Sequence, residues 1–571
     1  MLTTLTAPAF AKEWYIEDGD ITVKAGESGN DVTQNNETTV NDHDTIITNR
    51  EEGASSHTVT IDAKDKDDKV EVTLKDVNID ASSRSEAAVS VTGKGDTTIE
   101  LDGDNELQGG DRHAGLEHNQ TVDSEGNVTS GKLTIQDDND NAGSLTATGG
   151  YFGAGIGGGS AKAGQVTITG GTITAISGDG AGIGGGQGNM GSNAGNADIE
   201  ISGGTIEATG GYTSAGIGGG YYGDATIKIT GDAVIKNSTG GVYGSGIGGG
   251  GGGNGDVTIS GNAKIENAQG GDTGSGIGGG YGASGTVTIK DDSTVTATGG
   301  EAGAGIGGGV GGLADVTIEG NATVNATGGV GSAGIGGGYD AENDDDGTGN
   351  QITIKSNESG APTVNATGGE SSIDEETEEK IPGGAGIGSG VGDAKANITL
   401  EGKVTIVAKA GEGNAAIGDM NGEQVFTGLD GSITRYDSEG NDTTLPTDPG
   451  YPVPAVPSSS GGGSADASVQ ESVFPGLVVT DKDGQRISYT SIRGNNVLSI
   501  RVGRFTASLR ASLATLRQLR AEGIDTITFQ TILCSTTLSV DELLAMGGED
   551  TEVVLTHHIR SSTLTVGGKA V

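Results

Sequence analysis

The sequence predicts a mostly β protein in which a right-handed parallel β-helix, a solenoid of coils about 30 residues long, precedes a small C-terminal α+β domain. Three observations support this prediction. A glycine-rich motif recurs along most of the chain, short segments of alternating apolar and polar residues recur between its copies, and the composition changes over the last part of the chain.

The recurring motif is Gly-Ile-Gly-Gly-Gly. Its central isoleucines are Ile156, Ile183, Ile217, Ile247, Ile277, Ile306 and Ile335, and altered copies surround Ile387 and Ile417. Successive isoleucines are 27 to 34 residues apart, apart from one step of 52 residues between Ile335 and Ile387. A sustained period of this length is the signature of a repeat array.

Each unit between residues 131 and 420 contains three short β segments. The first is an alternating triplet such as Val287-Thr288-Ile289, the second contains an apolar residue such as Val295, and the third is the glycine motif itself. Three strands joined by glycine corners describe one triangular coil of a β-helix, because glycine adopts positive φ at little cost. The motif isoleucines are then expected to point inward and stack from coil to coil.

We assign residues 12–440 to the β-helix. The glycine-motif coils span 131–420, preceded by atypical first coils at 12–130 and followed by a cap at 421–440, since terminal repeats of a solenoid must differ from internal ones. A linker is expected at 441–468, which holds five of the nine prolines and a Ser/Gly run.

Residues 469–571 are expected to form the small α+β domain. Its predicted helices are 508–522, ended by Gly523, and 540–546, with Ser539 as N-cap. Its single cysteine, Cys534, is expected in the core. Predicted strands are 476–480, 497–502, 526–531, 552–557 and 563–566.

Composition limits the function. Only 32% of the 571 residues are hydrophobic and 112 are glycine, which suits the thin interior of a solenoid better than one large core. The net charge of −46 argues against nucleic acid and anionic membranes as partners. No run of 18 or more apolar residues is present, so no membrane-spanning segment is predicted.

Residues 1–11 resemble the remnant of a signal peptide, because Ala9-Phe10-Ala11 fits a small-residue cleavage site. This feature predicts an extracellular protein, either secreted or associated with the cell wall.

Catalytic residue types are sparse along the predicted coils. No arginine occurs between Arg112 and Arg435, and no histidine occurs between His118 and His557. The coils also hold no dense set of carboxylates of the kind that hydrolases use. We therefore expect no enzyme activity, although the N-terminal coils leave a divergent polysaccharide lyase or hydrolase as an alternative.

Two acidic segments offer oxygen ligands of the type that Ca²⁺ accepts. They are 137–140 and the triplet Asp344, Asp345 and Asp346. Neither has EF-hand spacing, and a solvated acidic loop is the simpler explanation of both. No other cofactor is predicted.

Aromatic residues flank the glycine motif, and stacking of the coils would place them in a stripe along one edge. They are Tyr151, Phe152, Tyr212, Tyr221, Tyr243, Tyr281 and Tyr339. Aromatic faces flanked by hydroxyl groups are suited to holding sugar rings. The alternative is that these side chains merely cover glycine-rich corners.

The succession Val-Thr-Ile-x-Gly-Gly, Thr-Val-x-Ala-Thr-Gly-Gly and Ala-Gly-Ile-Gly-Gly-Gly resembles secreted β-helix proteins of anaerobic Gram-positive bacteria that are labelled carbohydrate-binding domain-containing proteins. The resemblance covers roughly residues 13–440 and implies glycan binding. A related group binds acidic plant polysaccharide with calcium through Asp-Gly-Ile-x-Ala steps. Those aspartates are replaced here by alanine or serine, so calcium-mediated binding does not transfer.

These features together predict a non-enzymatic secreted or cell-surface protein that binds a polysaccharide or a host or cell-surface glycan along one solenoid face. The main alternative is a structural adhesin stalk whose binding activity lies in the C-terminal domain.

Overall fold

A computed structural model describes residues 12–451 and 476–570, apart from 140, 190–194, 345–346, 374–379, 482–483, 488, 495, 503, 505, 532–534, 549–550 and 559–561. The chain forms two compact units, one of residues up to 438 with 444–451, and one of 439–443 with 452–571. The predicted signal remnant, most of the predicted linker, Cys534, Asp345 and Asp346 lie outside the described residues.

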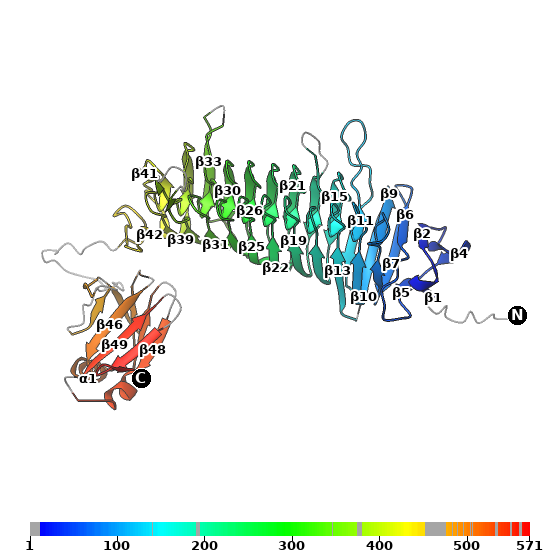
Figure 1. The fold of residues 1–571 in the computed structure, drawn as a ribbon. Coiled ribbons are helices and arrows are strands. Elements are labelled where there is room, and N and C mark those ends of the chain that lie inside the picture. Colours follow the sequence, from blue (N-terminus) through cyan, green and yellow to red (C-terminus); the bar gives the residue numbers. More distant parts are fainter. Residues whose placement is uncertain are drawn as a thin grey trace. The chain divides into compact units, whose positions relative to one another are not determined.

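The first unit is a parallel β-solenoid with three walls, visible in Figure 1 as stacked rows of short arrows. Wall A contains the Val-Thr-Ile strands, wall B the second strand of each coil, and wall C the Ile-Gly strands. The long strand β10 (Asp96–Gln108) bends from wall A into wall B.

Wall A consists, besides β10, of β1 (Lys12–Tyr15), β5 (Thr45–Thr48), β7 (Lys69–Lys75), β12 (Leu133–Gln136), β15 (Gly164–Ile168), β18 (Ala197–Ile201), β21 (Ala225–Ile229), β24 (Gly255–Ile259), β27 (Gly285–Ile289), β30 (Ala314–Glu319), β33 (Asn350–Lys355) and β38 (Ala396–Glu401).

Wall B consists, besides β10, of β8 (Asn78–Asp80), β13 (Gly143–Thr148), β16 (Thr172–Ile176), β19 (Thr205–Thr209), β22 (Val234–Thr239), β25 (Lys264–Gln269), β28 (Thr294–Thr298), β31 (Thr323–Thr327), β34 (Thr363–Thr367), β39 (Lys403–Lys409) and β42 (Asp430–Tyr436).

Wall C consists of β2 (Ile21–Ala25), β6 (Val59–Ala63), β9 (Val89–Gly93), β11 (Leu116–His118), β14 (Ile156–Gly157), β17 (Ile183–Gly184), β20 (Ile217–Gly218), β23 (Ile247–Gly248), β26 (Ile277–Gly278), β29 (Ile306–Gly307), β32 (Ile335–Gly336), β37 (Ile387–Gly388) and β40 (Ile417–Asp419).

The core is a set of side-chain ladders along the solenoid. Each motif isoleucine pairs with the isoleucine of the next coil, as Ile277 does with Ile306, and both are fully buried. The expected inward stacking of these isoleucines is therefore confirmed. Burial of each such side chain stabilises the fold by about 1.5–3 kcal/mol.

Both ends of the solenoid depart from the parallel pattern. At the N-terminal end, β2, β3 (Asn30–Gln34) and β4 (Glu37–Asp42) form an antiparallel meander. At the C-terminal end, β41 (Gly422–Glu423) pairs antiparallel with β40, and the Glu423 carboxylate accepts hydrogen bonds from the backbone N–H groups of Ala416 and Ile417. These elements satisfy strand edges that would otherwise be open to pairing.

The C-terminal cap extends further than its composition suggested. Residues 444–451 belong to the solenoid unit, although 441–468 was the expected linker. The Arg435 side chain is fully buried, and Asp448 from this segment accepts hydrogen bonds from its Nε (2.7 Å) and Nη2 (2.9 Å). A tertiary ion pair therefore holds a proline-containing segment that resembles a linker.

Three short elements complete this unit. The helical turn η1 (Ile16–Asp18) follows β1, and β35 (Ser372–Ile373) pairs antiparallel with β36 (Lys380–Ile381) within the 52-residue step.

The described residues of the C-terminal domain form two sheets and two helices. One sheet has the order β43 (Val478–Thr480), β46 (Ala507–Ser512), β49 (Glu552–His557), β50 (Ser562–Val566) and β51 (Lys569–Ala570). The other has the order β44 (Thr490–Gly494), β45 (Val497–Arg501), β47 (Thr526–Gln530) and β48 (Ser535–Ser539). The helices are α1 (Leu513–Ala521) and α2 (Val540–Leu544).

The helix predicted at 508–522 starts too early. Residues 507–512 form β46, which pairs with both β43 and β49. Leu509 fits a helical face in sequence, but cross-strand pairing on both sides makes it an inward-facing strand residue. Ser512 caps the real helix by accepting a hydrogen bond from the Thr515 N–H at 3.1 Å, and Gly523 has a φ of 87° beyond its end, as expected of a helix stop.

Neither helix of the described chain is long and apolar enough to cross a membrane.

Candidate functional site

Glycines on wall C and at the corner between walls B and C force neighbouring side chains outward. A Cβ added to Gly248 would lie 2.0 Å from the Gly278 carbonyl oxygen of the next coil, and a Cβ added to Gly271 would lie 1.6 Å from the Gly241 carbonyl oxygen. The backbones of adjacent coils therefore touch at these corners, and no side chain fits between them. Larger residues before and after the motif project away from the corner, which is where the tyrosines occur.

Three of the predicted tyrosines form a contiguous row over successive coils. The Tyr212 and Tyr243 ring centroids are 5.5 Å apart with an interplanar angle of 89°, and those of Tyr243 and Tyr281 are 5.7 Å apart at 64°. The Tyr281 N–H also donates to the Tyr243 carbonyl oxygen at 2.9 Å. Tyr212 is 55% exposed and Tyr281 is 49% exposed, so aromatic faces remain open to solvent.

A tyrosine pair adjoins this row. The Tyr221 hydroxyl donates to the Tyr222 hydroxyl at 3.1 Å, and the two ring centroids are 4.1 Å apart. This hydrogen bond, with burial and the negative charge of neighbouring tyrosinates, raises the pKa of Tyr221 to about 12. A side-chain hydrogen bond with Tyr243 likewise raises the pKa of Tyr212. The Tyr212 and Tyr221 phenols thus stay neutral at physiological pH.

Sequence reasoning missed Tyr222. Its φ of 54° is uncommon for a tyrosine, and a Cβ added to Gly252 would lie 2.5 Å from Tyr222 Cδ1, so the ring lies over a glycine of the next coil. The Tyr-Tyr dipeptide beside the motif was the available signal. We name Tyr212, Tyr221, Tyr222, Tyr243 and Tyr281 the tyrosine cluster.

The other three predicted aromatics lie apart from the tyrosine cluster. Tyr151 and Phe152 contact each other at 4.5 Å between centroids, and Arg112 lies over Phe152 at 5.4 Å. Tyr339 lies beside Gly331, in a place that Ile381 of the 52-residue step and Val391, just after that step, also approach. The expected single stripe is therefore divided into three groups.

A buried polar pair lies next to the tyrosine cluster. Asp179 is 8% exposed, and burial raises the pKa of its carboxyl group. Its Oδ2 accepts a hydrogen bond from Gln187 Nε2 at 3.3 Å. The Thr213 hydroxyl, adjacent in sequence to Tyr212, is buried and has no hydrogen-bond partner among the described residues.

The predicted calcium ligands are not gathered into a site by the described residues. Asp344 begins a turn in which its carbonyl oxygen accepts from Gly347 N–H at 2.7 Å. Asp137 accepts from the Gly143 N–H at 3.1 Å, which is a structural role. Among the described residues, no group of three or more His, Cys, Asp or Glu side chains is arranged to hold a metal ion.

The N-terminal coils hold a charged network that sequence reasoning did not identify. Arg84 binds Asp20 (2.9 Å) and Glu86 (2.6 Å). His113 binds Glu117 at 2.8 Å, and this hydrogen bond raises the pKa of His113 despite partial burial. Glu117 also accepts hydrogen bonds from the Ala114 N–H and Asn119 Nδ2. Because these groups satisfy one another, the network is explained by its structural role.

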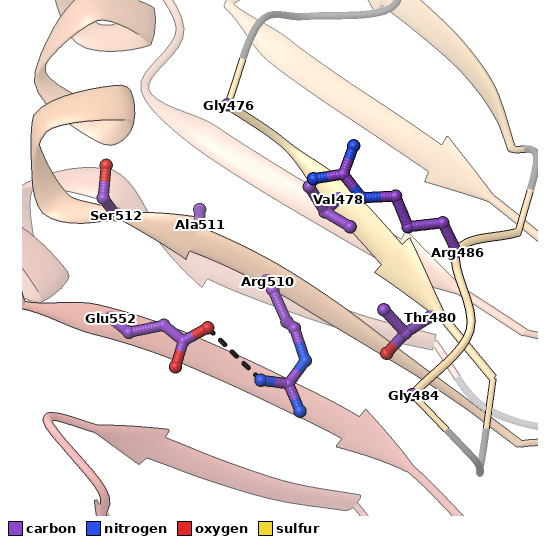
Figure 2. Close-up of a pocket in the computed structure, with 9 residues that line it drawn as sticks. All are labelled: Gly476, Val478, Thr480, Gly484, Arg486, Arg510, Ala511, Ser512 and Glu552. Atoms are coloured by element: carbon purple, nitrogen blue, oxygen red, sulfur yellow. Dashed lines mark hydrogen bonds and ion pairs between the residues drawn. The ribbon is translucent and has the colours of Figure 1, made fainter.

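The C-terminal domain contains a pocket of about 640 Å³ beside the edge strand β43. Figure 2 shows Arg486 and Arg510 among its lining side chains, together with Thr480 and Glu552. Arg510 pairs with Glu552 at 3.2 Å, whereas the Thr480 hydroxyl is buried and has no partner among the described residues. Two guanidinium groups near an unsatisfied hydroxyl suit an anionic group.

Comparison with known families agrees with this architecture. A model of the beta helix repeat matches residues 141–160, 166–187, 199–221, 287–310 and 316–339. These segments are similar to the beta helix repeat, in agreement with the parallel β-solenoid of the first unit. The matched segments all lie within the glycine-motif coils and include Tyr151, Phe152, Tyr212, Tyr221 and Tyr339. The comparisons with curated proteins and with solved structures found no match.

Proposed function

We propose that this β-helix protein binds carbohydrate through the tyrosine cluster, as a non-enzymatic protein of the extracellular space or cell surface. The observation that carries the proposal is the row of Tyr212, Tyr243 and Tyr281, whose rings contact one another while two of them remain about half exposed. Exposed aromatic faces with hydroxyl groups at their rims offer both an apolar surface and hydrogen-bonding groups to a sugar ring.

The regularity of the solenoid supports an elongated ligand. Coils repeat at a strand spacing of about 4.8 Å, so the three ring-bearing coils present contacts over about 10 Å along the solenoid. A glycan chain lying parallel to the axis would meet successive rings. An exposed row of rings over successive coils fits binding of a polymer better than enclosure of a small metabolite.

Binding of the full chain to a panel of oligosaccharides, with either EDTA or CaCl₂ present, tests the proposal. The triple variant Tyr212→Ala, Tyr243→Ala and Tyr281→Ala should bind its best glycan at least about tenfold more weakly, since each lost aromatic contact is worth about 0.5–1.5 kcal/mol. Tyr151→Ala is the matched control, because Tyr151 is 61% exposed and lies outside the cluster.

Circular dichroism should show that the triple variant remains folded, because the rings lie outside the buried core. Equal affinities of the triple variant and the parent chain would contradict the proposal. A loss of binding in EDTA alone would instead indicate a calcium-dependent ligand.

The alternative, a structural stalk with its binding activity in the C-terminal domain, is favoured by the arginine pocket of Figure 2. In that case Arg486→Ala should abolish binding to an anionic ligand while the tyrosine triple variant leaves it unchanged. Arg517→Ala, an exposed arginine on α1 outside the pocket, serves as its control.

A further inference from the structure

A second cleft lies on wall A, in the coils before the tyrosine cluster. Its volume is about 450 Å³, and its floor includes Val166 and Thr167 of β15, which are 1% and 5% exposed. Thr167 occupies an outward-facing position of its strand but is buried, because side chains of the neighbouring strands cover it. Its lining residues include four lysines, namely Lys66, Lys94, Lys132 and Lys228.

The lysines come from four different coils. Lys66, Lys94 and Lys132 lie at the corner between wall C and wall A, because they follow β6, β9 and β11 and precede β7, β10 and β12. Lys228 lies within β21, where it pairs in register with Glu200 of β18. The parallel stacking of coils therefore gathers cations that are up to 162 residues apart in sequence, from 66 to 228.

Most of the acidic groups in the cleft are already engaged. Glu200 pairs with Lys132 at 3.2 Å, and Asp96 accepts a hydrogen bond from the Lys132 backbone N–H at 3.0 Å. Within the described residues, Lys66, Lys94 and Lys228 form no ion pair, and Asp198 is the remaining carboxylate of the cleft. The cleft thus holds four lysines against three carboxylates, a net excess of one positive charge (4 minus 3).

This excess is unexpected in such an acidic protein. Residues 471–571 contain 10 basic and 10 acidic residues, so the preceding part of the chain carries 22 basic residues (32 minus 10) and 68 acidic residues (78 minus 10). With about three carboxylates for each cation, unpaired lysines converging on one cleft need an explanation beyond chance. An anionic ligand held by the three lysines that form no ion pair among the described residues supplies one.

We propose that this cleft binds the carboxylate or sulfate groups of an acidic glycan, which names the class of carbohydrate that the solenoid recognises. The proposal rests on the proposed function, since it assumes that the solenoid binds glycans. Lys228 lies in the same coil as Tyr221 and Tyr222, six residues beyond Tyr222, so one chain following the corner reaches both surfaces. The hydroxyls of Ser130 and Thr167, which also line the cleft, are suited to uncharged sugar positions.

The strong negative charge of the whole solenoid does not prevent this contact. At physiological ionic strength the Debye length is about 8 Å, so carboxylates further from the cleft are largely screened. Within that distance a bound anion meets the four lysines and three carboxylates that line the cleft, so the lysines are in excess there. Lysine is also strongly hydrated and flexible, which suits a polymer whose charges are not fixed in one geometry.

The experiment compares three oligosaccharides of equal length by calorimetry at 0.15 M NaCl: a uronic-acid oligomer, a sulfated oligomer and a neutral oligomer. The parent chain should bind an acidic oligomer at least about tenfold more tightly than the neutral one. The variant Lys66→Gln, Lys94→Gln, Lys228→Gln should lose this preference and keep the affinity for the neutral oligomer. Lys290→Gln, which removes a lysine directly after β27 and outside the cleft, should change neither.

Each outcome bears on one of the two proposals. Tighter binding of the uronic-acid oligomer would indicate recognition of carboxylates, and tighter binding of the sulfated oligomer would indicate recognition of sulfates. An unchanged acidic preference in the lysine variant, with circular dichroism confirming its fold, overturns the cleft. Acidic binding that depends on the lysines but survives the tyrosine triple variant overturns the tyrosine cluster instead and leaves the cleft as the glycan site.

Discussion

At the scale of single residues, two requirements dominate this protein. Glycine is required on wall C because adjacent backbones touch there, and the motif glycine after each isoleucine has a φ between 129° and 153°. A side chain at such a position would suffer both backbone strain and a clash. The second requirement concerns buried polar groups, which must be paired or neutral. His118, 2% exposed on β11, is an example.

The pH dependence of the N-terminal coils follows from His118. Burial lowers the pKa of His118 below its ordinary value of 6.5, although its Nδ1 hydrogen bond to the Gln165 carbonyl oxygen opposes the shift. Below pH 6.5 the His118 side chain therefore binds a proton more readily in the unfolded chain than in the folded chain. The free energy of unfolding should be at its full value above that pH and fall as the pH drops below it.

Denaturation followed by fluorescence of Trp14, the single tryptophan of the chain, measures this effect because Trp14 is 5% exposed in the same coils. His118→Gln should flatten the dependence below pH 6.5. His113 acts in a separate window, since its raised pKa gives stability that is lost only as the pH rises above its ordinary value. A parent chain whose stability is constant from pH 6.5 down to pH 5 would contradict the assignment.

At the scale of elements, the ends of the solenoid are its vulnerable points. Internal strands are paired on both sides, whereas the last strands of each wall would expose open edges. The cap from β41 to Tyr451 covers the C-terminal edges, and the buried Arg435 side chain holds this cap in place. Arg435 binds Asp448 and Glu423, donates to the Ile417 and Gln424 carbonyl oxygens, and lies 5.7 Å from the Phe426 ring.

Breaking this buried network should destabilise the solenoid strongly. Asp448→Asn leaves the fully buried Arg435 short of a counter-charge, and loss of one partner of a buried pair costs about 3–5 kcal/mol. Arg50→Met is the matched control at the other end, because the Arg50–Asp18 pair is about half exposed and screened by solvent, so its loss should cost little. Urea denaturation of both variants provides the measurement, and equal shifts in midpoint would refute a special role for the cap.

At the scale of the whole molecule, the formal net charge differs between the solenoid part of the chain and the C-terminal domain. Residues 471–571 are neutral by formal charge, and the rest of the chain carries the entire −46. Mutual repulsion of so many carboxylates opposes a compact solenoid, and salt screens it. The small C-terminal domain has no such excess. The two units should therefore respond differently to ionic strength.

Scanning calorimetry at about 0.01 M and about 0.15 M NaCl tests this expectation, since the Debye length falls from about 30 Å to about 8 Å over that range. The solenoid transition, identified by its coincidence with the Trp14 fluorescence change, should move to higher temperature by a few degrees. The C-terminal transition should stay in place. Equal displacement of both transitions would show that the charge of the solenoid is not the cause.

The sequence by itself determined the solenoid, because the glycine period and the alternating triplets follow from backbone contact and inward stacking at every coil. It also determined which residues flank the corners. Tertiary structure decided the rest. Residues 507–512 form a strand because β43 and β49 pair with them on both sides. Residues 444–451 belong to the cap because Asp448 provides the counter-charge for the buried Arg435. The aromatic row was divided, and lysines from distant segments were gathered, by the register of the stacked coils. Local patterns encode periodic backbone contacts, whereas pairing partners and shared clefts depend on which segments the coils bring side by side.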